Sequence, residues 1–209
     1  MQNNLGIVGI DFSLNYTCIA ILDSSDYFFC SITREENLSK KQKEIITDLE
    51  KLGKFKNFYI NKFKEGNDYQ ENQLLKIKDI KIISDIILNI LKEQNINNIK
   101  LEGLSYSSLG QRSLDLAGYN YILRYLIVEN FRELKIVAPS SIKKTAGKGN
   151  LNKVGMFESF ISNKLDDNIL TGNEIYKYIL NKKEIFNKNK KTIVEPVAGL
   201  IDSYFILHS

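Results

Sequence analysis

Alternating and clustered apolar residues predict three successive strands at the start of the chain. The apolar runs are Leu5–Asp11, Tyr16–Asp23 and Asp26–Thr33, and only a few turn-forming residues separate them. Such short connections favour an antiparallel meander. The following segment, 37–66, has a mixed pattern, with a Lys-rich helical stretch near 39–52.

A long amphipathic helix is the clearest single element and is predicted over Asp68–Gln94. Asp68 followed by Glu71 has the spacing of a capping box. Six apolar residues recur at steps of three or four and predict one buried stripe, namely Leu74, Ile77, Ile80, Ile83, Ile87 and Leu91. A strand over Ile99–Glu102 follows, and the helical crossover predicts that it runs parallel to the first strand.

The second half of the chain alternates helices with strands. The expected elements are a loop at Gly103–Gln111, a helix at Leu114–Phe131, a strand at Lys135–Ala138, a short helix opened by Pro139, a helix at Lys153–Leu165, and a final helix with Pro196 in its first turn. Residues 166–192 are expected to be an inserted or mobile segment with a short helix near 173–181. The fold class is therefore α/β: a mixed five-stranded sheet with helices on both faces, in a single domain over residues 1–209.

Composition narrows the class of protein. A length of 209 residues, with 43% hydrophobic residues and 2 prolines, supports a sizeable core and excludes general disorder. No apolar run approaches the roughly 20 residues that span a bilayer, and Met-Gln-Asn-Asn does not resemble a secretory signal, so a cytoplasmic location is expected. Cys18 and Cys30 are expected to be buried free thiols in a reducing compartment. The single histidine, His208, argues against a histidine-based general base or metal site.

The distribution of charge along the chain is more informative about a binding partner than the net charge of +4. Five lysines and no acid lie between Lys135 and Lys153, and six lysines with one acid lie between Lys177 and Lys191. Basic stretches of this kind suit the phosphate backbone of a nucleic acid. A solvated Lys-rich surface is the alternative.

Three carboxylates lie in segments that would otherwise belong to the core. Asp11 and Glu102 end two predicted strands, and Asp202 interrupts an apolar helix. Carboxylates are rarely buried without a partner or a metal ion. Facing one cleft, the three would form a divalent-metal site suited to phosphodiester hydrolysis. The alternatives are a turn-capping Asp11, a surface Glu102 and an Asp202 paired with a lysine.

The order of several short motifs resembles that of a known nuclease superfamily. The segments Gly9-Ile10-Asp11-Phe12-Ser13-Leu14-Asn15, Leu101-Glu102-Gly103-Leu104-Ser105-Tyr106 and Ile201-Asp202-Ser203-Tyr204 resemble those of the ribonuclease H-like nucleases. Leu116-Ala117-Gly118, Leu123-Arg124-Tyr125-Leu126, Val137-Ala138-Pro139-Ser140-Ser141-Ile142-Lys143-Lys144 and Gly147-Lys148-Gly149-Asn150-Leu151-Asn152-Lys153 resemble the phage branch of the RuvC-type Holliday-junction resolvases. The resemblance covers residues 5–160 and 195–207.

This resemblance implies a ribonuclease H-like fold and a Mg²⁺-dependent crossover junction endodeoxyribonuclease that acts as a homodimer. Its substrates would be four-way junctions and other branched DNA, cut by paired nicking in phage recombination or DNA processing inside a bacterial host. Asp11 would bridge two Mg²⁺ ions, Glu102 would hold one and Asp202 the other, with Mn²⁺ expected to substitute. Oxygen ligands of this kind suit Mg²⁺ or Mn²⁺ rather than zinc.

Other residues are candidates for contacting DNA. Lys143, Lys144 and Lys148 are expected to contact phosphates, and Lys153 to contact DNA or stabilise the transition state. Ser105 and Tyr106, in the loop after Glu102, are expected to contact phosphate and to stack on an exposed base or sugar. Ordinary solvated lysines and a packed tyrosine are the alternatives.

One position departs from the family pattern, which carries a fourth acid three residues before the last aspartate. Gly199 stands there, and Glu195 is the nearest upstream acid. Along a helix, Glu195 would lie about 10 Å from Asp202, too far to share an ion unless the helix begins later and the chain folds back. Three acids with water, substitution by Glu195, and a weakened site in a junction-binding protein remain open. In the last case Gly199→Asp would switch on cleavage.

A ribonuclease that acts on RNA–DNA hybrids is a further alternative, because the same fold supports several nuclease functions.

Overall fold

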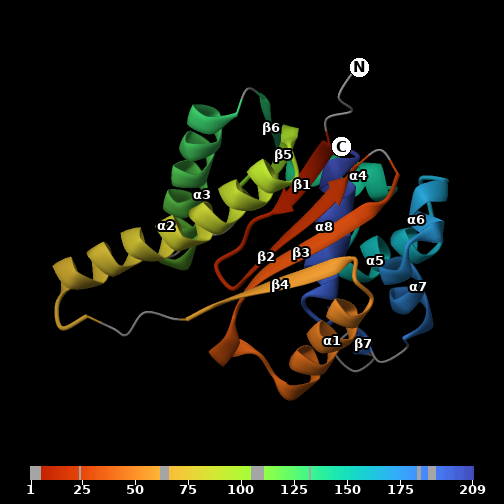
Figure 1. Cartoon of the computed structure of the whole chain (residues 1–209), viewed down its shortest axis with the longest axis horizontal. Coiled ribbons are helices and arrows are strands. Elements are labelled where there is room, and N and C mark those ends of the chain that lie inside the picture. Colours follow the sequence, from red (N-terminus) through yellow and green to blue (C-terminus); the bar gives the residue numbers. More distant parts are fainter. Residues whose placement is uncertain are drawn as a thin grey trace.

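A mixed six-stranded sheet forms the middle layer of the computed structural model, which describes residues 6–23, 25–61, 66–104, 111–131, 133–182, 185–187 and 192–209. The strands stand in the order β4-β3-β2-β1-β5-β6 (Figure 1). They are β1 (Gly6–Asp11), β2 (Tyr16–Leu22), β3 (Tyr27–Arg34), β4 (Phe55–Ile60), β5 (Ile96–Glu102) and β6 (Glu133–Val137). β1, β2 and β3 form the predicted antiparallel meander, and β5 runs parallel to β1 as predicted.

The sheet has one strand more than the predicted five. The additional strand, β4, pairs in parallel with β3 at the edge of the sheet. The sequence pattern does not predict this strand, because Asn57 takes a buried position where an apolar residue is expected. The hydroxyls of Ser31 and Thr33 on β3 donate hydrogen bonds to Asn57 Oδ1 at 2.5 and 3.2 Å. Neighbouring side chains therefore satisfy this buried amide, as a buried polar group requires.

Helices cover both faces of the sheet, so the predicted α/β class is confirmed. The helices are α1 (Lys40–Lys51), α2 (Tyr69–Glu93), α3 (Gln111–Asn130), α4 (Pro139–Ala146), α5 (Lys153–Ile161), α6 (Asn168–Gly172), α7 (Glu174–Asn181) and α8 (Val197–Leu207), with a 3₁₀ turn at Glu35–Asn37. α2 and α3 share one apolar core with the sheet, and α1 and α4 to α8 contribute to a second core on the other face.

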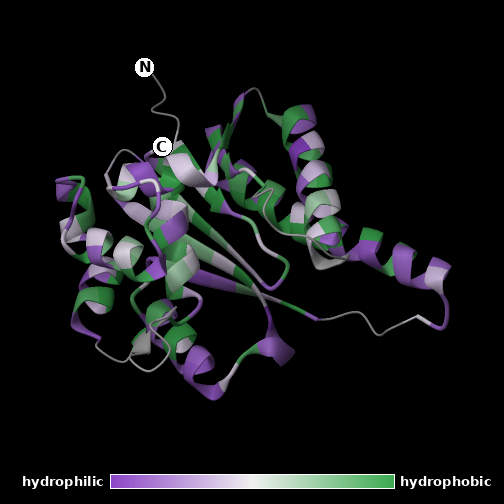
Figure 2. Cartoon of the chain, turned by 180° about the vertical axis from the view of Figure 1, so that it is seen from behind, coloured by the Kyte–Doolittle hydropathy of each residue, from purple (hydrophilic) through white to green (hydrophobic). Residues whose placement is uncertain are grey.

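The predicted long helix is α2, and its first turn is capped as expected. Asp68 Oδ1 accepts a hydrogen bond from the backbone N–H of Glu71 at 2.8 Å. The predicted stripe, however, is buried only in its later turns. Leu74 and Ile77 are 50% and 58% exposed, because the N-terminal half of α2 extends past the sheet (Figures 1 and 2). The expectation of one continuous buried stripe is therefore wrong for these two residues.

A buried ion pair ties the α2–α3 layer to the sheet. Arg34, at the end of β3, pairs with Asp79 on α2, and the Tyr119 hydroxyl donates to the same Asp79 oxygen at 3.1 Å. Arg34 Nε also donates to the carbonyl oxygen of Leu14 at 3.1 Å. This network holds the turn that follows Asp11 in a fixed position.

The described part of segment 166–192 contains α6, the predicted short helix α7, and a small ribbon of β7 (Phe186–Asn187) and β8 (Thr192–Ile193). Leu170, Ile175 and Ile179 are buried in the same core as α8. Cys18 and Cys30 are buried free thiols, as expected. Among the described residues, no helix combines the length and hydropathy needed to cross a membrane.

Two glycines allow α8 to lie directly on β1 and β2. A Cβ atom added at Gly9 on β1 would lie 2.5 Å from the backbone nitrogen of Leu207 on α8. A Cβ atom added at Gly199 on α8 would lie 2.6 Å from Cys18 Sγ on β2. Real Cβ atoms do not approach other atoms this closely, so the contact between α8 and the two strands requires glycine at both positions.

We expect Gly199→Ala to destabilise the protein by about 1–3 kcal/mol, because the added methyl group overpacks the contact with Cys18. Gly172→Ala at the end of α6 is the matched control, since nothing lies within 4 Å of its added Cβ. There the gain in helix propensity should stabilise the protein by about 0.5–1 kcal/mol. Urea unfolding of both variants measures the difference, and a shift of the same sign and size in both would contradict the packing argument.

Candidate active site

The ends of β1 and β5 bring Asp11 and Glu102 together. The two strands are parallel neighbours, with Ile10 paired to Leu101, so the residues that follow this pair lie side by side. Both acids are partly accessible at the edge of the sheet. A side-chain hydrogen bond to Glu102 contributes to raising the pKa of Asp11.

The environment of Asp11 raises its pKa well above the usual value near 3.8. Burial is the main cause, because surrounding protein atoms disfavour the charged form. The negative charge of Glu102 and the hydrogen bond to it act in the same direction, whereas the charge of Lys153 lowers the pKa. A cation bound beside Asp11 would offset the unfavourable effects of burial and of the Glu102 charge.

Asp202 lies on α8 and is the only residue of that helix in the described sequence with an ion pair. Lys153 Nζ contacts Asp202 Oδ2. Lys153 is the first residue of α5, whose N-terminus is capped by Asn152 through a 2.9 Å hydrogen bond from the N–H of Gly155. The lysine pairing considered as an alternative for Asp202 is thus present in the structure.

Glu195 lies in the turn just before α8, which begins only at Val197. Glu195 Oε2 accepts a hydrogen bond from the backbone N–H of Gly199 at 3.0 Å. Burial raises the pKa of Glu195, and its negative charge in turn raises the pKa of Asp11. The structure therefore meets the condition under which Glu195 can approach the site.

Position 199 has no room for an acid. A side chain there would begin 2.6 Å from Cys18 Sγ and 3.3 Å from Asp11 Oδ2. An aspartate would have to displace buried Cys18 and would bring a third negative charge against Asp11. Gly199→Asp is therefore expected to strain the contact between α8 and β2, and its effect on cleavage stays a prediction.

The predicted DNA-contacting lysines lie on α4 and the turn after it. Lys143 and Lys144 belong to the last turn of α4, and Lys148 is exposed between α4 and α5. None of these three lysines forms an ion pair with another described residue, so their charges are available to an anionic partner. Ser105 and Tyr106 lie outside the described residues.

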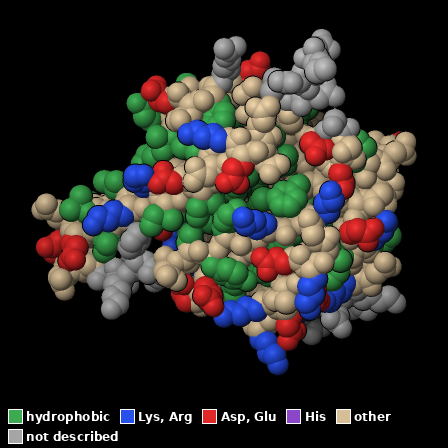
Figure 3. All heavy atoms as spheres, in the orientation of Figure 1, with side chains coloured by type: hydrophobic (Ala, Val, Ile, Leu, Met, Phe, Trp, Pro, Cys, Tyr) green, Lys and Arg blue, Asp and Glu red, His purple; other side chains and the backbone are tan. Residues whose placement is uncertain are grey.

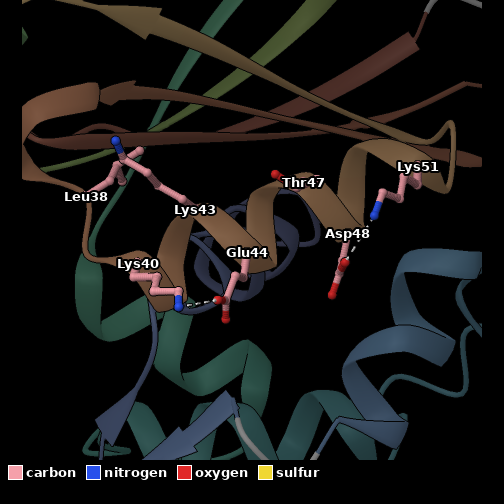
Figure 4. Close-up of a pocket in the computed structure, with 7 residues that line it drawn as sticks. All are labelled: Leu38, Lys40, Lys43, Glu44, Thr47, Asp48 and Lys51. Carbon is pink, nitrogen blue, oxygen red and sulfur yellow. Dashed lines mark ion pairs between the residues drawn. The ribbon is translucent and has the colours of Figure 1, made fainter.

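An open groove on the outer side of α1 is separate from these acids. Its lining residues, drawn in Figure 4, are Leu38, Lys40, Lys43, Glu44, Thr47, Asp48 and Lys51. Lys40 pairs with Glu44 at 4.0 Å, and Lys51 pairs with Asp48 at 3.7 Å. These ion pairs join residues of the groove to one another, and none of the candidate site residues lines it. The acidic site is therefore the better candidate for function.

The acidic residues fit a divalent cation in donor type and in charge. Their donors are carboxylate oxygens, which suit Mg²⁺ and Mn²⁺, and the mutual repulsion of Asp11 and Glu102 is what a cation would relieve. As their side chains now stand, no three His, Cys, Asp or Glu residues of the described chain form a metal-holding group. Asp202 is directed to Lys153 instead, so completing such a site requires this carboxylate to leave its lysine.

We expect Asp11→Asn to stabilise the protein in EDTA at neutral pH. The folded-state pKa of Asp11 lies above its unfolded value, so its favourable contribution is complete below about pH 4 and is lost as the pH rises through the folded pKa. Asparagine removes the charge and still donates a hydrogen bond to Glu102. For a chain of this size, a gain of about 1 kcal/mol raises Tm by about 2–4 °C.

Asp23→Asn is the control of opposite sign for thermal unfolding in EDTA. Hydrogen bonds from the backbone of Ser25 and Asp26 lower the pKa of Asp23, so its charge stabilises the fold. This variant should be less stable than wild type. A lower Tm for Asp11→Asn as well would contradict the repulsion inferred at the site.

The comparisons with known proteins agree with this architecture at the level of the fold. Neither a protein-family model nor a curated protein matches the sequence. Among solved structures, the Thermus thermophilus RuvC structure aligns with a TM-score of 0.51 and 10% sequence identity, over 97% of this chain and 92% of that chain. At this identity the likeness shows the fold alone: the chain has a mixed α/β fold of the ribonuclease H-like, RuvC-like type.

Proposed function

We propose that this protein is a metal-dependent endodeoxyribonuclease that resolves four-way DNA junctions and other branched DNA by paired nicking, in phage recombination or DNA processing. One observation carries the proposal. On a RuvC-like fold, Asp11 and Glu102 meet at the ends of adjacent strands with the pKa of Asp11 well above its usual range. A retained pair of repelling acids at strand ends is costly for folding and is typical of a functional site.

Asp11, Glu102 and Asp202 are proposed as the residues that would hold two Mg²⁺ ions, with Mn²⁺ as a substitute. When bound, such ions activate water and neutralise the charge that develops on phosphate oxygens. The protein's part is to orient the carboxylates: the end of β1 fixes Asp11, the end of β5 fixes Glu102, and α8 carries Asp202. Once released from Asp202, the Lys153 ammonium is positioned to contact a phosphate or stabilise the transition state.

Unpaired lysines support a DNA-binding surface next to these acids. α4 and α5 both pack on α8, which carries Asp202. Lys143, Lys144 and Lys148 on this layer are proposed to contact backbone phosphates, since none of them forms an ion pair within the described chain. Ser105 and Tyr106 remain predicted DNA contacts.

An exposed apolar stripe on α3 supports a homodimer. Leu114, Tyr121, Tyr125 and Val128 are each more than half exposed, and they recur at steps of seven, four and three residues. Gly118 continues the same row, with nothing within 4 Å of the position of its Cβ. Hydrophobic side chains also gather over α2 and α3 in Figure 3. An apolar stripe with this spacing matches a helix-packing interface.

A labelled four-way junction, incubated with Mg²⁺, Mn²⁺ or EDTA, tests the proposed reaction. Symmetric nicks are expected with either metal ion and none with EDTA. Asp11→Asn should bind the junction with wild-type affinity but fail to cut it, because binding depends on lysine–phosphate contacts. Cleavage by Asp11→Asn would disprove the assigned site. Faster cleavage of an RNA–DNA hybrid than of the junction would instead indicate a ribonuclease.

Val128→Glu should convert a dimer to a monomer in light scattering at micromolar concentration, since a charge would be buried in the α3 interface. Leu180→Glu on α7 is the matched control, because this leucine is also exposed but lies away from α3. A wild-type protein that is monomeric under these conditions would contradict paired nicking by a homodimer.

Junction binding without cleavage is the second candidate function. The Lys153–Asp202 ion pair favours it, because this pair occupies one of the carboxylates that a metal ion would need. In the cleavage experiment, wild-type protein that shifts the junction but produces no nick with either metal ion would select this function.

A further inference from the structure

Glu195 is a partly buried acid that the proposed roles of the other residues leave unexplained. It forms no ion pair with any other described residue, and its side-chain hydrogen bond there is the one from the Gly199 N–H. An acid in such surroundings is destabilising, and burial raises its pKa. Lys153, the main positive influence on it, already contacts Asp202. Glu195 therefore lacks a compensating charge of its own.

The carboxylate of Glu195 belongs to the same group of acids as Asp11. Both approach Gly199: Glu195 through the backbone N–H, and Asp11 on the side where a Cβ atom would stand. The charge of Glu195 raises the pKa of Asp11, and both acids raise the pKa of the Cys18 thiol. Glu195 and Asp11 thus both lie near the first turn of α8, and Lys153 is the cation whose charge acts on both.

The geometry also explains why the acid comes from position 195. Cys18 closes position 199 to any side chain, so an acid on the first turn of α8 cannot face Asp11 from there. Glu195 precedes α8 by two residues, and its side chain reaches forward along the first turn to the N–H of Gly199. A glutamate before the helix therefore reaches the space that a shorter acid at position 199 would otherwise use.

We propose that Glu195 supplies a fourth carboxylate of the metal site and that the Gly199 N–H holds it in place. This inference rests on the proposed metal-dependent function. The charges support it, because four carboxylates balance two divalent cations, whereas three leave an excess positive charge. The hydrogen bond to Gly199 uses Oε2 and leaves the second carboxylate oxygen available as a ligand.

A purely structural role as a helix cap is the competing explanation. A negative charge near the first turn of a helix stabilises the helix dipole. Glu195→Gln separates the two roles, because glutamine keeps an oxygen acceptor for the Gly199 N–H but removes the charge. A cap role predicts that this variant is less stable without metal and binds metal normally. A ligand role predicts that it is at least as stable in EDTA and binds metal weakly.

Calorimetric titration with Mn²⁺ and thermal unfolding in EDTA test the assignment together. We expect Glu195→Gln to bind Mn²⁺ at least about 10-fold more weakly than wild type, with an equal or higher Tm in EDTA. Glu44→Gln on α1 is the charge-matched control and should change Mn²⁺ affinity less than about twofold. An unchanged Mn²⁺ affinity in Glu195→Gln overturns the assignment.

Two further outcomes keep this inference separate from the proposed function. Wild-type protein that binds Mn²⁺ and cuts junctions, together with an equally active and equally tight-binding Glu195→Gln, overturns the role of Glu195 alone. Wild-type protein that binds no Mn²⁺ overturns both. If Glu195→Gln does not fold, Glu195→Asp replaces it: several-fold weaker Mn²⁺ binding supports the ligand role, and unchanged binding overturns it.

Discussion

The contact between α8 and the first two strands is the constraint on which the rest of the site depends. Gly9 and Gly199 let the backbones approach to a distance that no other residue permits. Because α8 lies this close to the strands, position 199 in its first turn stands beside Asp11. The same contact excludes a side chain at position 199. One packing requirement thus both brings the start of α8 to Asp11 and prevents an acid at position 199 from reaching it.

The positions of the acids destabilise the folded protein. Asp11 has its pKa raised by burial and by Glu102, so ionising both carboxyl groups costs stability at neutral pH. Interactions in the surrounding structure have to offset this loss of stability. It does so partly through the buried network in which Arg34 joins Asp79 and the carbonyl of Leu14, close to the turn after Asp11. The arrangement of the acids lowers the stability of the fold but suits catalysis, as is common at functional sites.

Strand ends and helix caps could be predicted from the sequence because they depend on neighbouring residues. Asp68 capping α2 and Asp11 ending β1 are of this kind. The errors arose where distant contacts decide. β4 was missed because side chains of β3 satisfy Asn57. The role of Gly199 stayed open between three interpretations, because only the folded chain places Cys18 against it. Periodicity alone could not show where α8 begins, and hence where Glu195 points.

The arrangement of charge around α8 gives the proposed function its physical basis. Glu195 and Asp11 lie near the start of the helix, while α4, which carries the unpaired Lys143 and Lys144, and α5, which begins at Lys153, pack on it. Lys153 is the point where the two groups meet, because it sits at the start of α5 and pairs with Asp202. A phosphate drawn to the lysines would therefore arrive beside carboxylates that require cations, and a cation bound there would attract the phosphate further. The rigid packing of α5 on α8 couples the two sets of charges, so that neither the lysines nor the acids can be understood separately.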